Sequence, residues 1–452
     1  MALIAGDIEG GNLLKRLGVL LTDFLLFENV DNDLVVDTAS MLGGIAPHSA
    51  ARVLFDRGAD VSHFRYFSND DTCSALRDWL VADDPAQLAV FQPLQAGFTS
   101  MDAAGIVATR GGTPLPDRPI VVVLPGVMGS HLRVDGADRV WFDLPDLVAG
   151  GLEKITWSRQ QVEAEALWDR YYGSLCAYLA KNHRVQPFAY DWRQPLDVLG
   201  ERLGEFLDAL MKDTQQPVRL IAHSMGGLVV RACVARWPGV MDMLMQRDGA
   251  RLVMLGTPNQ GAWSMVENLL GKGDTLRTLI RLDLQHDMQQ VLDIVAGFRG
   301  PLALLPRPGF KDMFQGQRDG GGDYALQDSA TWAAFRDKVR DFWFGDHHSA
   351  VPSQQALDEA SWLWRQDAAA SPDGHPTLPP AYAGKSIYVH GVAASTPCGV
   401  REEGDRLKIV GTSRGDGTVT WESGRIGGIG SFYYMPAAHG DLPATAGGRA
   451  AR

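Results

Sequence analysis

A short apolar run followed by a serine and glycines constrains this chain more than any other feature. Residues 218–222 (VRLIA) are typical of a buried strand in a parallel sheet, and residues 227–236 have the composition of a helix that stops before a proline. A serine on such a strand-to-helix turn has a strained backbone and tolerates only small residues two positions away on either side, as at Ala222 and Gly226. The sequence therefore predicts that Ser224 is a nucleophile presented on a sharp turn.

A second serine matches the literal Gly-x-Ser-x-Gly pattern, which the Ser224 segment matches only with alanine in the first position. This serine is Ser413, in the segment GTSRG at 411–415. The residues that follow it, Asp-Gly-Thr at 416–418, cannot begin a helix, so the strand-to-helix turn is missing. We therefore predict that Ser413 is not the nucleophile.

An acid and a base follow Ser224 in the chain. Asp416 lies between two glycines after the apolar run 407–410, which reads either as a common turn or as a carboxylate directed at a histidine. His439 lies in a loop flanked by proline and glycine, where a histidine is commonly just solvated. Together with Ser224, the catalytic interpretation is favoured for both residues. Asp441 is the alternative acid, although it is only two positions from His439.

The chain order serine, aspartate, histidine predicts the fold class. An α/β-hydrolase carries its nucleophile after a mid-sheet strand, and its acid and base arrive later on loops. We therefore expect an α/β protein with a mostly parallel sheet flanked by helices. The long stretch between the nucleophile and the acid predicts a helical cap inserted at about 259–384.

Stabilisation of an oxyanion needs two amide donors in such a site. One is the amide of the residue after the nucleophile, Met225. The other is expected in the glycine-rich loop after the β-branched run 119–124, where Val127 is the first candidate and Met128 the second. An ordinary turn at the end of a strand is the simpler interpretation of this loop.

Six segments spread over residues 118–442 resemble the lecithin:cholesterol acyltransferase family. They are LPGVMG at 124–129, YDWR at 190–193, AHSMG at 222–226, GTPN at 256–259, YVHGV at 388–392 and GDGTV at 415–419. The resemblance implies an acyl-enzyme on Ser224 with Asp416 and His439 as partners. It also implies oxyanion donors at Val127 and Met225 and a mobile lid after Gly261. Extracellular members have disulfides that no cysteine pairing here matches.

Composition sets limits on partners and compartment. A net charge of −12 over 452 residues argues against binding nucleic acid or an anionic membrane by electrostatics alone. Four widely spaced cysteines predict neither a disulfide scaffold nor a zinc site, and the neighbouring His347 and His348 read as a polar loop. No signal peptide and no membrane-spanning run are evident, so we expect a cytoplasmic protein. The predicted serine, aspartate and histidine need no metal or cofactor, and we expect none.

The first 82 residues predict a separate segment. Residues 2–5 read as a strand, 13–27 as a helix and 72–81 as another helix. Asp33 and His63 lie 30 positions apart, compared with 23 for Asp416 and His439. The segment therefore reads either as the tail of a second α/β-hydrolase, which would need a partner hydrolase domain, or as an unrelated αβ segment. Residues 83–117 are the expected connector to a catalytic domain at 118–452.

The cap has two interpretations. Residues 265–270, 275–284 and 288–298 have apolar side chains at helical spacing, which is most simply explained by packing on the sheet. The second interpretation is an acyl-chain groove or a lid that contacts a lipid surface. The sequence thus predicts a lipid-ester hydrolase or acyltransferase, and leaves open whether water or an alcohol accepts the acyl group. A catalytically inactive hydrolase fold that serves as a binding or signalling module is the alternative.

Overall fold

The computed structural model describes residues 118–446 apart from 137, 160, 284, 315–316, 321–322, 339–350, 371–373 and 405. In the first 117 residues it describes 2–8, 52–58, 74, 77–78 and 92–93. Contacts divide the chain into two units, Met1–Pro114 and Leu115–Arg452. Each unit is described by itself below.

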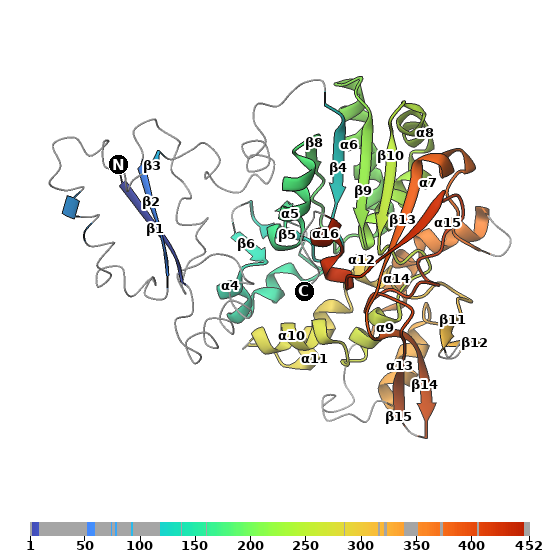
Figure 1. The fold of residues 1–452 in the computed structure, drawn as a ribbon. Helices are drawn as coiled ribbons and strands as arrows, with labels where there is room; N and C mark the ends of the chain where they lie inside the picture. Colours follow the sequence, from blue (N-terminus) through green and yellow to red (C-terminus); the bar gives the residue numbers. More distant parts are fainter. Residues whose placement is uncertain are drawn as a thin grey trace. The chain divides into compact units, whose positions relative to one another are not determined.

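A parallel sheet of six strands forms the centre of the second unit (Figure 1). Its strand order is β16-β13-β10-β9-β4-β8, and every neighbouring pair is parallel. The strands are β4 (Ile120–Leu124), β8 (Arg184–Pro187), β9 (Val218–His223), β10 (Arg251–Leu255), β13 (Ser386–Gly391) and β16 (Ser431–Met435). All five residues of β4 are buried, as expected for an apolar strand covered on both faces. The predicted parallel sheet is confirmed.

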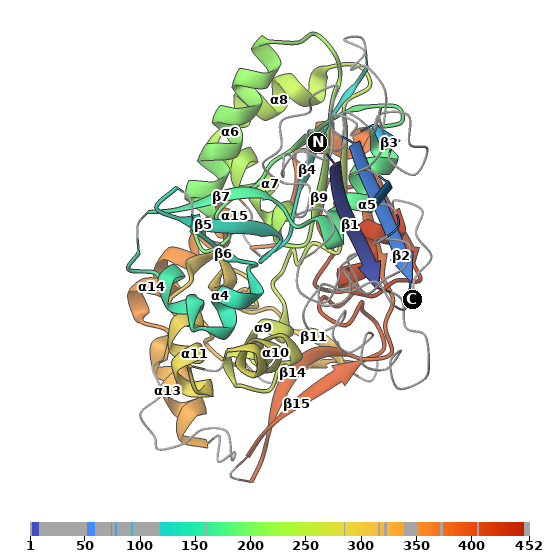
Figure 2. The ribbon, with the colours of Figure 1, turned by 90° about the vertical axis from the view of Figure 1, so that its left-hand side faces the viewer.

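Helices cover the sheet, and Figure 2 shows α6 and α7 on one side of β4 and β9 and α5 on the other. Helix α6 (Leu196–Lys212) packs on α7 (Met225–Arg236), with Leu199, Leu203 and Leu207 buried at a spacing of four. The other helices of these layers are α5 (Asp169–Leu179), α8 (Pro238–Gln246), α15 (Trp362–Ala370) and α16 (Leu442–Ala446). No helix of the described residues is both long and apolar enough to span a membrane. The sheet and its helices make an α/β-hydrolase architecture.

The predicted helical insertion follows β10. Its elements are α9 (Trp263–Leu269), α10 (Asp274–Leu282), α11 (Met288–Val295), α12 (Arg299–Leu302), the hairpin β11 (Asp312–Phe314) and β12 (Gln317–Gly320), α13 (Ser329–Lys338) and α14 (Gln354–Ala360). The 3₁₀ helix η6 (Pro380–Lys385) leads from α15 into β13. Helix α15, within the same stretch of chain, packs on α6 and α7. The insertion thus contributes to the body of the domain as well as to the cap.

Two further small sheets lie beside the central sheet. Strands β5 (Ser130–Val134), β6 (Asp138–Trp141) and β7 (Val162–Leu167) form an antiparallel sheet, with α4 (Leu144–Val148) and the 3₁₀ helix η5 (Gly151–Ile155) between β6 and β7. Strands β14 (Thr396–Glu403) and β15 (Arg406–Thr412) form a separate antiparallel hairpin, seen at the lower edge of Figure 1. The run 407–410 is therefore a strand, but it belongs to this hairpin and not to the central sheet.

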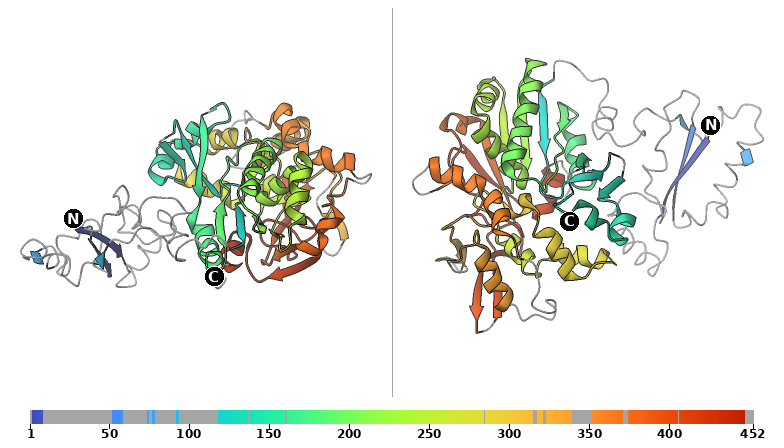
Figure 3. Two further views of the ribbon diagram at one scale, coloured as in Figure 1. Left: turned by 90° about the horizontal axis from the view of Figure 1, so that it is seen from above. Right: turned by 180° about the vertical axis from the view of Figure 1, so that it is seen from behind.

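The described part of the first unit contains three strands. Strand β1 (Ala2–Ile8) lies parallel to β2 (Arg52–Gly58), as Figure 2 and the right-hand view of Figure 3 show, and β3 (Gln92–Pro93) pairs with β2 in antiparallel. The strand predicted at 2–5 is present and longer than predicted, and β2 was not predicted. The helix expected at 13–27, Asp33 and His63 lie outside the described residues, as do most of 72–81.

Candidate active site

Ser224 occupies the turn between β9 and α7. Its backbone has φ 52° and ψ −124°, a left-handed conformation that is strained for a serine. The Ser224 amide donates to the carbonyl of Leu255 on β10 at 2.8 Å, which holds the turn in place. A Cβ atom built on Gly126 would lie 2.9 Å from the Ser224 Cβ. Because this distance is too short, the loop after β4 can run this close to Ser224 only with glycine at position 126. The strain is therefore maintained by the two neighbouring strands.

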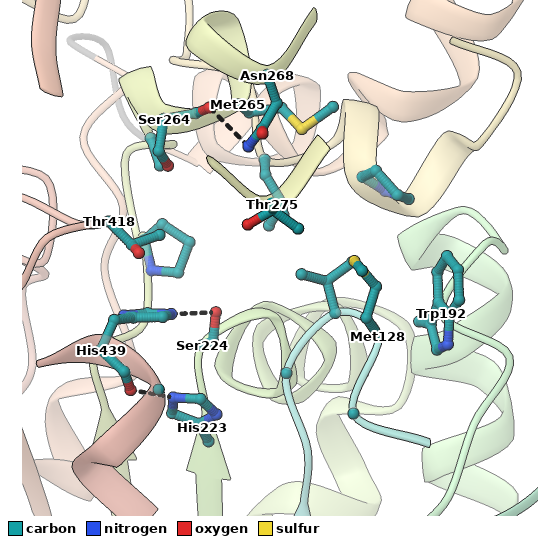
Figure 4. Close-up of a pocket in the computed structure, with 18 of the residues that line it drawn as sticks. Met128, Trp192, His223, Ser224, Ser264, Met265, Asn268, Thr275, Thr418 and His439 are labelled. Atoms are coloured by element: carbon teal, nitrogen blue, oxygen red, sulfur yellow. Dashed lines mark hydrogen bonds between the residues drawn. The ribbon is translucent and has the colours of Figure 1, made fainter. Parts of the chain in front are cut away.

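The structure brings Ser224, His439 and Asp416 together in one hydrogen-bonded row. His439 Nε2 lies 2.8 Å from Ser224 Oγ, and His439 Nδ1 lies 2.8 Å from Asp416 Oδ2. The bond between His439 and Ser224 is drawn in Figure 4. Because a carboxylate only accepts, Nδ1 carries the proton and Nε2 accepts from the serine hydroxyl. This tautomer is the one needed for a general base.

Asp416 is held in an environment that keeps it ionised. The residue is 1% exposed, and its Oδ1 atom accepts hydrogen bonds from the amides of Thr418 at 2.9 Å and Val419 at 2.7 Å. Burial by itself would raise the pKa of Asp416, but the charge of His439 and these hydrogen bonds hold it below its ordinary value. The carboxylate therefore remains available to orient His439.

Two glycines make room for the acid and the base. Gly256, after β10, has φ 56°, and a Cβ there would lie 2.9 Å from Asp416 Oδ2 and 3.0 Å from His439 Nδ1. Gly391, at the end of β13, would place a Cβ 2.6 Å from the Asp416 Cβ. Both lie in segments that carry the family resemblance, but no pattern in the sequence alone assigns them this role.

The alternative residues lie elsewhere. Ser413 is exposed in the loop after β15, and the carboxylate that accepts from His439 Nδ1 is Asp416, not Asp441. His347 and His348 lie outside the described residues. Within the described part of the chain, no group of three or more His, Cys, Asp or Glu side chains is arranged to hold a metal ion.

The loop after β4 carries the first and second candidates for an oxyanion donor, Val127 and Met128, beside Ser224. The amide of Gly126 donates to Tyr172 Oη at 2.7 Å, and that of Gly129 donates to the Gly126 carbonyl at 3.1 Å. Val127 and Met128 lie between these two glycines, and both residues line the cavity beside Ser224. Met225 begins α7 directly after the nucleophile, where the helix N-terminus adds partial positive charge. The predicted oxyanion donors therefore lie around Ser224.

A cavity of about 330 Å³ lies over Ser224 and His439. Aromatic and aliphatic side chains form most of its wall: Trp141, Leu152, Trp168, Tyr171, Trp192, Met265, Leu276, Leu279, Val295, Phe298 and Leu304. Three polar cap residues, Ser264, Asn268 and Thr275, lie across the cavity from Ser224 in Figure 4. Among the described residues, no Asp, Glu, Lys or Arg lines it. The site thus combines the hydrogen-bonded row of Ser224, His439 and Asp416 with a cavity that is lined almost entirely by uncharged side chains.

Two segments of the chain match the models of protein families. Residues 142–308 match the family model of lecithin:cholesterol acyltransferase. The match contains Ser224 and the helices α9 to α12, which line the cavity, whereas Asp416 and His439 lie beyond it. The resemblance seen in the sequence is confirmed over this segment. Residues 7–81 match a second model, described only as a domain of unknown function (DUF7379).

Comparison with solved structures matched this chain to proteins that include the following two. A chain in the crystal structure of the Tle4–Tli4 complex has 13% identity and a TM-score of 0.44, covering 72% of this chain and 93% of that chain. The mature lipase BlEst2 of Bacillus licheniformis has 12% identity and a TM-score of 0.32, covering 73% and 88%. No curated protein sequence matches this chain.

Proposed function

We propose that this protein is a serine acyl hydrolase or acyltransferase that forms an acyl-enzyme on Ser224. The observation that carries the proposal is the row from Ser224 Oγ through His439 to Asp416, with 2.8 Å between the partners at each step, at the floor of the cavity. A strained serine at a helix N-terminus, a base in the right tautomer and a buried carboxylate are the parts that acyl transfer requires.

The first half of the reaction transfers the acyl group to the enzyme. His439 Nε2 takes the hydroxyl proton as Ser224 Oγ bonds to the ester carbonyl carbon. The carbonyl oxygen becomes an oxyanion that accepts from the amides of Val127 and Met225, and Asp416 stabilises the imidazolium. The bond from carbon to the leaving oxygen then breaks, and His439 returns the proton to the departing alcohol.

The second half releases the acyl group by the same steps in reverse. A water or alcohol gives its proton to His439 Nε2 and bonds to the acyl carbon, and Ser224 leaves and recovers the proton. Water gives a free acid, whereas an alcohol gives a new ester. The acceptor depends on which of the two reaches the closed cavity.

The cavity supports a lipid ester as substrate. Its wall is built from Trp, Leu, Met, Val and Phe side chains, which would contact an acyl chain over its length. A charged substrate group inside the cavity would lose its water, and the described lining residues include no Asp, Glu, Lys or Arg to pair with it. We therefore place the acyl chain inside the cavity and any charged headgroup outside it. The family match over 142–308 agrees with an acyl substrate.

Labelling with a fluorophosphonate probe tests this proposal. The parent chain should be labelled at Ser224, whereas the folded variants Ser224→Ala and His439→Ala should not react. Parent protein should also release acyl groups from soluble p-nitrophenyl esters, and added alcohols would show whether transfer competes with hydrolysis. A folded parent that neither reacts with the probe nor cleaves esters would overturn the proposal and favour an inactive binding module.

A further inference from the structure

We propose that Tyr172 and His223 are positioning residues that hold the base loop and the oxyanion loop at a fixed separation. This inference rests on the proposed function. It concerns two buried side chains that the triad does not use: Tyr172 on α5, 2% exposed, and His223 at the end of β9, 6% exposed. Both line the cavity beside Ser224.

The two side chains connect parts of the site that are far apart in the sequence. Tyr172 Oη lies 2.7 Å from the Gly126 amide nitrogen and 2.8 Å from His223 Nδ1. His223 Nε2 lies 3.0 Å from the carbonyl oxygen of His439, 216 positions later, a bond drawn in Figure 4. One chain of hydrogen bonds therefore runs from the loop after β4 to the backbone of the base.

Every proton in this chain has one allowed position. The His439 carbonyl only accepts, so His223 Nε2 must donate, and a neutral imidazole then leaves Nδ1 as an acceptor. Tyr172 must donate its hydroxyl proton to Nδ1, and its oxygen accepts from the Gly126 N–H. The donors thus run in one direction, from Gly126 to His439.

The surroundings keep His223 neutral, as this scheme requires. Burial, together with the charge of His439, lowers the pKa of His223 to about 3. The rings of His223 and His439 have centroids 5.0 Å apart, so a second cation there would oppose the imidazolium that forms during catalysis. A neutral side chain can instead hold the loop of His439 without competing for its proton.

His439 is consequently fixed on both sides of its backbone. Its amide donates to the Asp416 carbonyl at 2.8 Å, and its carbonyl accepts from His223. At the other end, Tyr172 fixes Gly126, next to the proposed donor Val127. His223, which precedes Ser224, therefore sets, together with Tyr172, the distance between the base His439 and the oxyanion donor Val127.

Three variants test the chain of hydrogen bonds. Tyr172→Phe removes the middle hydroxyl. His223→Asn keeps an acceptor toward Tyr172 but is too short to reach His439, whereas His223→Gln is long enough to donate to the His439 carbonyl. We expect kcat per active site, with sites counted by fluorophosphonate titration, to fall by about 10- to 100-fold in Tyr172→Phe and His223→Asn. His223→Gln should recover at least part of this loss, and KM for a short soluble ester should stay within about threefold in all variants.

Tyr382→Phe is the matched control. Tyr382 is also buried and donates through its hydroxyl, to Asp242 at 2.6 Å, but it lies outside the cavity. It should lose stability on thermal melting while keeping kcat per titrated site. The double variant Tyr172→Phe with His223→Asn should be no slower than the worse single variant, because both break one chain.

The outcomes separate this inference from the proposed function. An active, labelled parent whose Tyr172→Phe and His223→Asn variants keep the parent kcat per titrated site would overturn the positioning role alone. A loss of titratable sites with normal kcat in the rest would also overturn it, since that result indicates only a folding role. An unlabelled, inactive parent would instead overturn the proposed function.

Discussion

A comparison of Ser224 with Ser413 shows that a short sequence motif does not by itself identify a nucleophile. Ser413 matches the literal pattern, yet it lies exposed after the hairpin strand β15. Ser224 departs from the pattern at one position, yet it lies between a sheet strand and a helix, 2.8 Å from a histidine. What separates the two serines is the element on each side of them. A parallel strand followed at once by a helix creates the strained turn, and the residues of a two-stranded hairpin do not.

The two serines also differ in the residues that surround them. The turn at Ser224 faces the carboxyl ends of β10 and β13, where Gly256 and Gly391 leave space for Asp416 and His439. The loop at Ser413 belongs to a hairpin outside the central sheet. A serine becomes a candidate nucleophile here because the sheet gathers other loops around it.

Alanine substitutions at Ser224 and Ser413 should separate the two serines most clearly. Ser224→Ala should lower ester turnover by about 10⁴-fold or more, because the attacking oxygen is gone. Ser413→Ala should keep turnover within about twofold, since exposed surface substitutions are nearly neutral. Initial rates on a p-nitrophenyl ester, with folding checked by circular dichroism, measure both. The opposite ranking would mean that the pattern, not the strand-to-helix turn, identifies the nucleophile.

Asp416→Asn tests whether Ser224 depends on its distant acid. An amide can donate to His439 Nδ1, so the proton would move to Nε2, which could no longer accept from the serine. We expect kcat to fall by about 10³- to 10⁴-fold, with KM for the same ester little changed. Asp441→Asn is the control and should keep most of the rate. Equal losses in the two variants would contradict the assignment of Asp416 as the orienting carboxylate.

Gly256→Ala tests the space around the acid and base. The new methyl group would press between Asp416 and His439, and we expect kcat to fall about 100-fold. Gly309→Ala is a matched control, because Gly309 also has a left-handed backbone, with φ 71°, but nothing lies within 4 Å of its Cβ position. Both variants should lose roughly 1–2 kcal/mol of unfolding free energy to backbone strain, measured by urea denaturation. If both lost the same activity, strain and not contact would explain the effect.

His390 gives the smallest effect, on stability in acid. Burial lowers the pKa of this β13 histidine to about 4, against 6.5 for the ordinary side chain. The unfolded chain therefore takes up the proton first as the pH falls, and stability is lost between about pH 6.5 and 4. His390→Phe should keep the ring stacking with Phe432 and Tyr434 and reduce this slope by up to about 1.4 kcal/mol per pH unit. Urea midpoints at several pH values measure the slope, and identical slopes in the two proteins would show that His390 does not contribute.

The sequence alone determined the local features of this protein. Apolar runs at 119–124 and 218–222 predicted buried strands, which the structure confirms as β4 and β9. The order of Ser224, Asp416 and His439 predicted the fold class and an inserted cap, because an α/β-hydrolase presents these groups in that order. Strand periodicity and turn chemistry depend on residues a few positions apart, so they can be read along the chain.

Which elements surround those features depends on how the whole domain folds. The strand expected at 407–410 does precede the loop of Asp416, as β15, but it pairs with β14, which lies just before it in the chain, and not with a strand of the central sheet. The roles of Gly256, Tyr172 and His223 depend on contacts with residues tens to hundreds of positions away. A single sequence specifies such contacts only through the packing of the whole domain, so they become visible when the strands and loops are brought together.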